Sequence, residues 1–189
     1  MKKIPLKIIA TIFLLSILGL GSIKAQVMEP GSVIANQAWE DRNGYNELYI
    51  KVYAACNPDK PPYDGHESEI QVRLKNKNHE LNIHYELEDY QMQMLFFSQK
   101  NIRYFNFEKI RAVFIPFSYC GNADTINRVS YIILYDDSSY LKHIDFYCTE
   151  AGKCKLLSDL VILSDIPDIL RERLISELER YNDIEDFLQ

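Results

Sequence analysis

Apolar and polar residues alternate along much of the chain, which is the pattern of β-strands with one buried and one solvated face. The segments 69–75 and 81–88 both alternate in this way. A tight turn between them would set Leu74 opposite Leu81 and, at the next position, a lysine opposite a glutamate. The two segments therefore predict one β-hairpin.

A second hairpin is predicted at Asn43-Gly44, because both residues tolerate the positive φ of a two-residue type I′ turn. Folding there would set Trp39 beside Leu48. The opposite face of the second strand would then carry three tyrosines, Tyr45, Tyr49 and Tyr53.

A third hairpin is predicted at Asp137-Ser138, where it would pair the segments 129–133 and 142–146 and set Ser130 across from Asp145. A fourth closes around the short polar stretch between Cys148 and Cys154. Further β-rich runs cover 92–97, 102–107 and 112–119.

The C-terminal region has a different period. An acid at 165, Pro167 and Asp168 are typical of a helix start, and apolar residues then recur with a spacing near 3.6. This pattern predicts an amphipathic helix over 166–188 that packs on the sheet. Its polar side is acidic or mixed rather than basic, which favours core packing over docking on a membrane or a partner helix.

Together these elements predict a mainly β fold with a C-terminal amphipathic helix packed on it. So many short antiparallel strands do not fit one open sheet, so we expect a meander that forms a sandwich or a curled, barrel-like sheet. The chain is similar to the lipocalins in the order of its elements alone. The Gly-x-Trp opening of that family is absent, because Gln37 and Ala38 precede Trp39.

Residues 1–25 have the pattern of an export signal, with lysines at the start, an apolar run over 8–20 and Ala25 before the expected cut. The run is shorter than the ~20 residues that span a bilayer. No cysteine precedes Cys56, so a lipid anchor is not expected. We therefore expect a single β-rich domain over 26–189, without membrane insertion after cleavage, in the periplasm or secreted from a bacterial cell.

Charge narrows the range of partners. Cleavage would remove the four lysines of the expected signal. The mature chain would then keep 17 of the 21 basic residues against 27 acidic ones, a net charge of about −10. Such a surface repels phosphate backbones and anionic lipids, and no cluster of basic residues offsets it, so binding to nucleic acid is not expected.

All four cysteines lie in the expected mature chain, where an oxidising compartment favours disulfides. Cys148 and Cys154 flank a hairpin-like loop, which leaves Cys56 to pair with Cys120. Zinc binding is the alternative, but no C-x-x-C pair or suitably spaced histidine accompanies these cysteines.

Three groups of residues offer catalytic or metal chemistry. The expected register places Ser130, His143 and Asp145 on one face, where their types match a nucleophile, a base and an orienting acid. No G-x-S-x-G motif supports this reading, and a polar cross-strand cluster is the alternative. Glu86 and Glu88 share one strand face and could act as a carboxylate pair. A solvated strand face is the favoured interpretation, because exposed strand positions ordinarily carry such residues.

A calcium loop is suggested by Asp41 and Asn43, whose oxygens stand at alternate positions. The ligand set is incomplete, and the hairpin turn explains the same residues. His79 and His84 are separated by one residue more than the H-E-x-x-H motif allows, so we reject them as a zinc pair. No cofactor is expected.

Aromatic residues suggest a binding role. Tyr45, Tyr49 and Tyr53 would form a stripe suited to a protein or sugar, although tyrosine is also a good strand former. The proline-rich loop 57–67 carries Tyr63 and His66 and is either a binding loop or a connector. We therefore expect an exported, non-enzymatic domain that binds a protein, a small molecule or a glycan, with a periplasmic hydrolase as the alternative.

Overall fold

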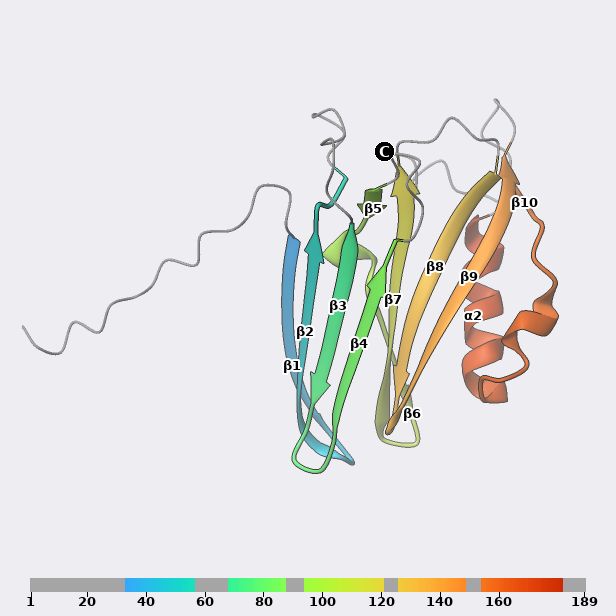
Figure 1. Ribbon diagram of the computed structural model, residues 1–189. Helices are drawn as coiled ribbons and strands as arrows, with labels where there is room; N and C mark the ends of the chain where they lie inside the picture. Colours follow the sequence, from blue (N-terminus) through green and yellow to red (C-terminus); the bar gives the residue numbers. More distant parts are fainter. Residues whose placement is uncertain (1–32, 57–67, 88–93, 121–125, 149–153, 182–189) are drawn as a thin grey trace, which may run out of the picture.

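The computed structural model describes residues 33–56, 68–87, 94–120, 126–148 and 154–181 (Figure 1). This part of the chain is mainly antiparallel β-structure, with two sheets and one α-helix, as the alternating pattern predicts. The expected signal peptide lies outside the described residues. The strands are β1 (Val33–Asp41), β2 (Gly44–Tyr53), β3 (Glu69–Lys75), β4 (Glu80–Glu86), β5 (Met94–Phe96), β6 (Arg103–Phe107), β7 (Ile110–Cys120), β8 (Ile126–Tyr135), β9 (Ser138–Cys148) and β10 (Cys154–Leu156).

The first sheet is a meander in the order β1-β2-β3-β4. In the β3–β4 hairpin Leu74 faces Leu81 and Lys75 faces Glu80, which confirms the predicted register. Apolar and charged pairs both favour this one alignment, because a slip by one residue would turn the apolar side chains to the solvent.

The β1–β2 hairpin turns one residue earlier than predicted. Asp41 pairs with Gly44, so Trp39 faces Asn46 rather than Leu48. The Asp41 carboxylate accepts a hydrogen bond from the backbone N–H of Asn43, and Gly44 adopts a φ of +94° directly after the turn. These two local features fix the turn at residues 42–43. The register shifts by two, so each side chain stays on its predicted face.

The β8–β9 hairpin differs from the prediction in the same way. Tyr135 pairs with Ser138, so the turn is at residues 136–137, and Ser130 lies opposite His143 rather than Asp145. Asp136 adopts a left-handed φ of +53°, which aspartate tolerates better than most residues, and its carboxylate accepts a hydrogen bond from Asn43 Nδ2 at 2.8 Å.

The second sheet has the order β10-β9-β8-β7-β5, with β6 also paired to β7. Neither sheet closes on itself, and the sequence-based alternative of a sandwich is the one adopted. One apolar core lies between the two sheets and includes Ile50, Val72 and Ile132. A second core lies on the other face of the second sheet, against the helix. The second sheet is therefore the middle layer of three (Figure 1).

Helix α2 (Asp168–Tyr181) covers this second core. It falls inside the predicted range 166–188, of which residues 182–189 lie outside the described part. Leu170, Leu174 and Leu178 are buried at the predicted helical spacing against the outer side of the middle sheet. Packing on the sheet is thus the role of the apolar stripe.

Two disulfides form with the predicted pairing. Cys56–Cys120 joins the end of the first sheet to the end of β7, and Cys148–Cys154 joins two opposite residues of β9 and β10. Paired thiols of this kind indicate an oxidising, non-cytoplasmic environment. Within the described ranges, no helix is both long and apolar enough to cross a membrane.

At the opposite end of the sandwich, hairpin tips from both sheets are tied together. The tip of β1–β2 bonds to that of β8–β9 through Asn43 and Asp136. His79, in the β3–β4 turn, lies 3.2 Å from Asp137 of the same β8–β9 tip. The two sheets are therefore fastened at both ends.

Candidate functional site

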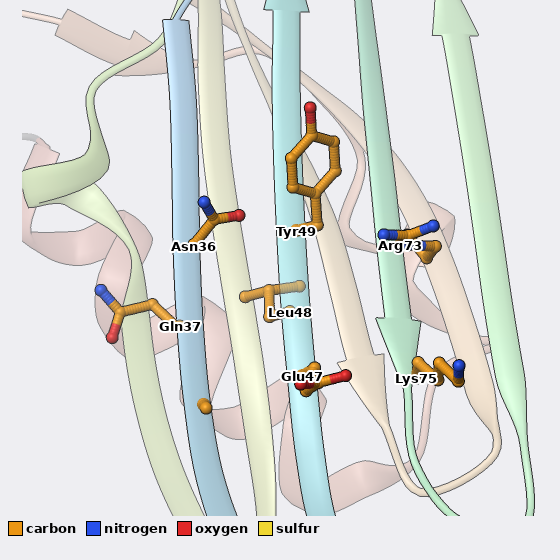
Figure 2. Close-up of a pocket in the computed structure, with 8 residues that line it drawn as sticks. Asn36, Gln37, Glu47, Leu48, Tyr49, Arg73 and Lys75 are labelled. Carbon is orange, nitrogen blue, oxygen red and sulfur yellow. The ribbon is translucent and has the colours of Figure 1, made fainter. Parts of the chain in front are cut away.

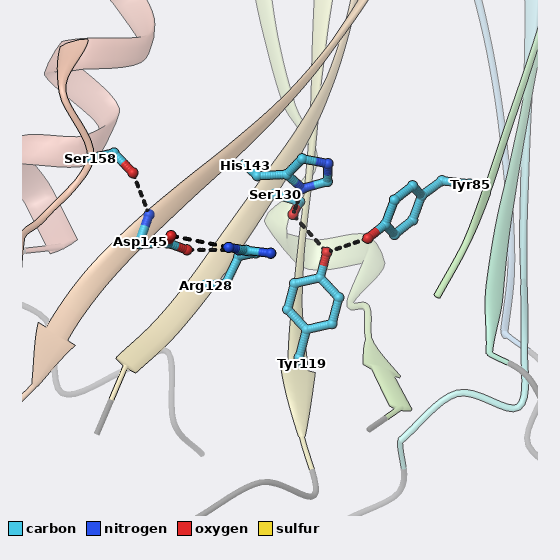
Figure 3. A network of polar contacts seen from close by, with 7 residues as sticks. All are labelled: Tyr85, Tyr119, Arg128, Ser130, His143, Asp145 and Ser158. Atoms are coloured by element: carbon cyan, nitrogen blue, oxygen red, sulfur yellow. Dashed lines mark hydrogen bonds and ion pairs between the residues drawn. The ribbon is translucent and has the colours of Figure 1, made fainter. Parts of the chain in front are cut away.

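The predicted serine and histidine meet, but the predicted acid does not join them. Ser130 Oγ and His143 Nδ1 are 2.7 Å apart across β8 and β9 (Figure 3). Asp145 instead accepts two hydrogen bonds from the guanidinium of Arg128, at 2.7 and 3.1 Å. The register shift explains this arrangement, because it sets Arg128, not Ser130, opposite Asp145.

The environment of this pair is that of a structural contact. Ser130 is 0% exposed, so a substrate has no access to its hydroxyl. Partial burial lowers the pKa of His143, as does the charge of Arg128, against a smaller opposing effect of Asp145. A histidine whose acid is engaged elsewhere lacks the group that orients it and stabilises its protonated form during catalysis.

A chain of hydroxyl contacts extends from Ser130 to the first sheet. Tyr119 Oη lies 2.9 Å from Ser130 Oγ and 3.0 Å from Tyr85 Oη (Figure 3). Burial raises the pKa of Tyr119 well above its ordinary value. Tyr85 belongs to β4 and the other residues to the second sheet, so this series of hydroxyl contacts satisfies the hydrogen-bonding capacity of polar groups between the two sheets.

The residues of the suggested calcium loop have other partners. The Asp41 carboxylate accepts hydrogen bonds from Trp39 Nε1, Asn46 Nδ2 and the backbone N–H groups of Asn43 and Arg111, at 2.9–3.1 Å. Partial burial acts to raise the pKa of Asp41, but these hydrogen bonds outweigh it and the pKa lies below its ordinary value. The carboxylate is thus a fastening point between β1–β2 and β7.

The other predicted groups contribute less. Within the described ranges, no group of three or more His, Cys, Asp or Glu side chains could hold a metal ion. Glu86 is exposed at the end of β4, while Glu88, Tyr63 and His66 lie outside the described residues. The carboxylate pair and the loop site stay predictions.

The three predicted tyrosines do share one face of β2, the solvent side of the first sheet, here called the outer face. Tyr45 is 58% exposed near the turn, and Tyr53 lies under the ammonium of Lys51, 3.7 Å from its ring centroid. Tyr49 is half-buried at the middle of the strand. Strand pairing sets Asn36 on one side of Tyr49 and Arg73 on the other.

A hollow surrounds Tyr49 on the outer face and is here called the Tyr49 hollow. It has a volume of about 380 Å³ and is lined by residues of β1, β2 and β3 (Figure 2). A neighbouring hollow of about 600 Å³ extends toward β4 and shares Tyr49 and Arg73. Figure 2 shows the Tyr49 ring lying along β2 with one face turned out of the sheet.

Polar side chains around this ring are not engaged with each other. Arg73 contacts the Tyr49 ring, with its guanidinium carbon 5.5 Å from the centroid. Among the residues that the structure describes, the side chains of Asn36, Glu47 and Lys75 make no hydrogen bond or ion pair, and Arg73 makes none beyond its ring contact. Donors and acceptors of the Tyr49 hollow are thus open to a ligand.

The sequence pattern identified Tyr49 but missed its neighbours. Asn36, Arg73 and Lys75 belong to other strands, and the pairing of β2 with β3 brings them together. That pairing was not predicted, because no short turn links these strands. No family model, curated protein or solved structure matches the chain. The function is therefore argued from the residues themselves.

Proposed function

We propose that this chain is an exported, non-enzymatic binding domain that holds a carbohydrate on its outer face, with one sugar ring stacked on Tyr49. The observation that carries the proposal is the outward face of the Tyr49 ring among polar side chains without partners. A pyranose has a flat side of C–H groups and a rim of hydroxyls. An aromatic face suits the first, and amide, carboxylate and guanidinium groups suit the second.

Shape and composition support the same proposal. The two hollows, of about 380 and 600 Å³, are open depressions of the sheet surface, which suits a ligand that lies along the sheet. Their lining includes the amides of Asn36, Gln71 and Asn82, which both donate and accept hydrogen bonds. The expected export signal and the two disulfides favour a location where extracellular glycans are encountered.

The test is titration of the mature protein against a panel of oligosaccharides, by array screening and then by calorimetry. Tyr49→Ala should weaken binding at least about tenfold, equivalent to about 1.4 kcal/mol. Tyr45→Ala is the matched control, because Tyr45 lies on the same face but does not line the hollow. Equal binding by wild type and Tyr49→Ala, or no binding of any oligosaccharide, would refute the proposal.

A hydrolase is the second candidate, favoured by the 2.7 Å contact between Ser130 and His143. The burial of Ser130 and the engagement of Asp145 with Arg128 weigh against it. Incubation with ester and glycoside substrates separates the two functions. Turnover that is lost in His143→Ala would establish the hydrolase, whereas the binding domain shows no turnover and His143→Ala retains its affinity.

A further inference from the structure

Arg73 occupies an unusual position on the outer face. Its neighbours across the sheet are Tyr49 and Asn82, neither of which carries a charge. The side chain is exposed, and within the described part of the chain it forms no ion pair, although acidic residues outnumber basic ones by 27 to 21. The guanidinium therefore retains its hydrogen-bond donors beside an aromatic ring.

Lys75 adds a second cation two residues along the same strand. It lies opposite Glu47 on one side and Glu80 on the other, but its ammonium is not within ion-pair distance of a described carboxylate. Figure 2 shows both side chains on β3, with Arg73 across from Tyr49 and Lys75 level with Glu47. Both cations thus line the Tyr49 hollow.

On the basis of the proposed function, we infer that the ligand of the Tyr49 hollow is an acidic glycan whose carboxylate, as in a uronic acid, is bound by Arg73. Arginine presents a planar fork that matches a carboxylate with two parallel hydrogen bonds. Because Arg73 is the cross-strand neighbour of Tyr49, a pyranose stacked on the Tyr49 ring can turn a carboxylate at its edge toward the guanidinium. Lys75 is a second cation of the same hollow, flanked by Glu47 and Glu80.

The charge of the whole molecule limits the kind of acidic glycan. The chain carries a formal net charge of −6, so it repels a dense polyanion at long range. Salt screens that repulsion over about 10 Å, whereas the contact with Arg73 is much shorter. A glycan with isolated carboxylates is therefore favoured over a heavily sulfated one.

The experiment compares a glucuronic-acid-substituted xylooligosaccharide with its methyl ester, which keeps the shape and removes the charge. Calorimetry should give at least tenfold tighter binding of the acid by the wild-type protein. Arg73→Gln should abolish this preference, so that the acid and the ester bind the variant with equal affinity. Lys51→Gln is the matched control, because it removes a cation of the same face that lies over Tyr53, and it should retain the preference.

The outcomes separate this inference from the proposed function. Equal binding of acid and ester by the wild type overturns the inference and leaves a neutral-glycan site. A preference that survives in Arg73→Gln overturns it as well, because the carboxylate then binds elsewhere. If neither of these glycans binds although another oligosaccharide of the panel does, the inference fails and the proposed function stands. If no oligosaccharide binds, or if an acidic peptide binds in place of every oligosaccharide, both fail.

Discussion

The two disulfides close loops of very different length, and their contributions to stability should differ accordingly. Cys56 and Cys120 are 64 residues apart, whereas Cys148 and Cys154 are 6 apart. If a cross-link acts mainly by restricting the unfolded chain, the long loop contributes about 4.3 kcal/mol and the short loop about 2.3 kcal/mol. All four cysteines are half-buried, so replacing either pair by alanine removes similar packing.

The measurement is urea unfolding of the oxidised protein and of the double variants C56A/C120A and C148A/C154A. With a dependence of about 2 kcal/mol per molar urea, the midpoint should fall by about 2 M for the long loop and about 1 M for the short one. The difference between the variants is the informative quantity, because it cancels shared effects. A short-loop variant that loses as much stability as the long-loop variant, or more, would refute the chain-entropy reasoning.

Three further changes test other parts of the fold. Asp41→Ala should cost about 2–4 kcal/mol in urea unfolding, because it removes the acceptor of Trp39 and Arg111; a cost below about 1 kcal/mol would contradict its fastening role. Leu174→Ala, at a fully buried site, should cost about 2–5 kcal/mol in the same assay, and a cost typical of surface positions would contradict its place in the core. The pKa of His143 is lowered on folding, so the neutral imidazole contributes to the free energy of unfolding above the unfolded pKa of about 6.5, and this contribution is lost as the pH falls through the folded pKa. Thermal melts between pH 4 and 8 should therefore show a smaller loss of stability on the acid side for His143→Gln than for wild type. Identical profiles would contradict this reasoning.

The register of a hairpin could be predicted where cross-strand side-chain pairs determine it, but not where the geometry of the turn determines it. In β3–β4 the apolar and charged pairs agree on one alignment. In β1–β2 the hydrogen bond from Asn43 N–H to the Asp41 side chain fixes the register, and in β8–β9 the left-handed backbone of Asp136 does so. The alternating pattern alone cannot detect a register shift by two residues, because every side chain stays on the same face of the sheet.

The candidate site shows the same division. Tyr49 could be selected from its position in an alternating strand, because the outer face follows from the period of two. Arg73 carries no comparable signal in the sequence, where it is one of many charged residues on a solvated strand face. Its significance comes from the pairing of β3 with β2 and β4, which sets it beside an aromatic ring and opposite uncharged residues.

The attachment of the two sheets has a consequence for recognition. Cys56–Cys120 holds one end, and contacts such as that between Asn43 and Asp136 hold the other. The first sheet therefore has little freedom to slide or flex over the layer beneath it. A ligand that binds to such a preorganised sheet loses mainly its own conformational entropy, so even a shallow contact area can give useful affinity.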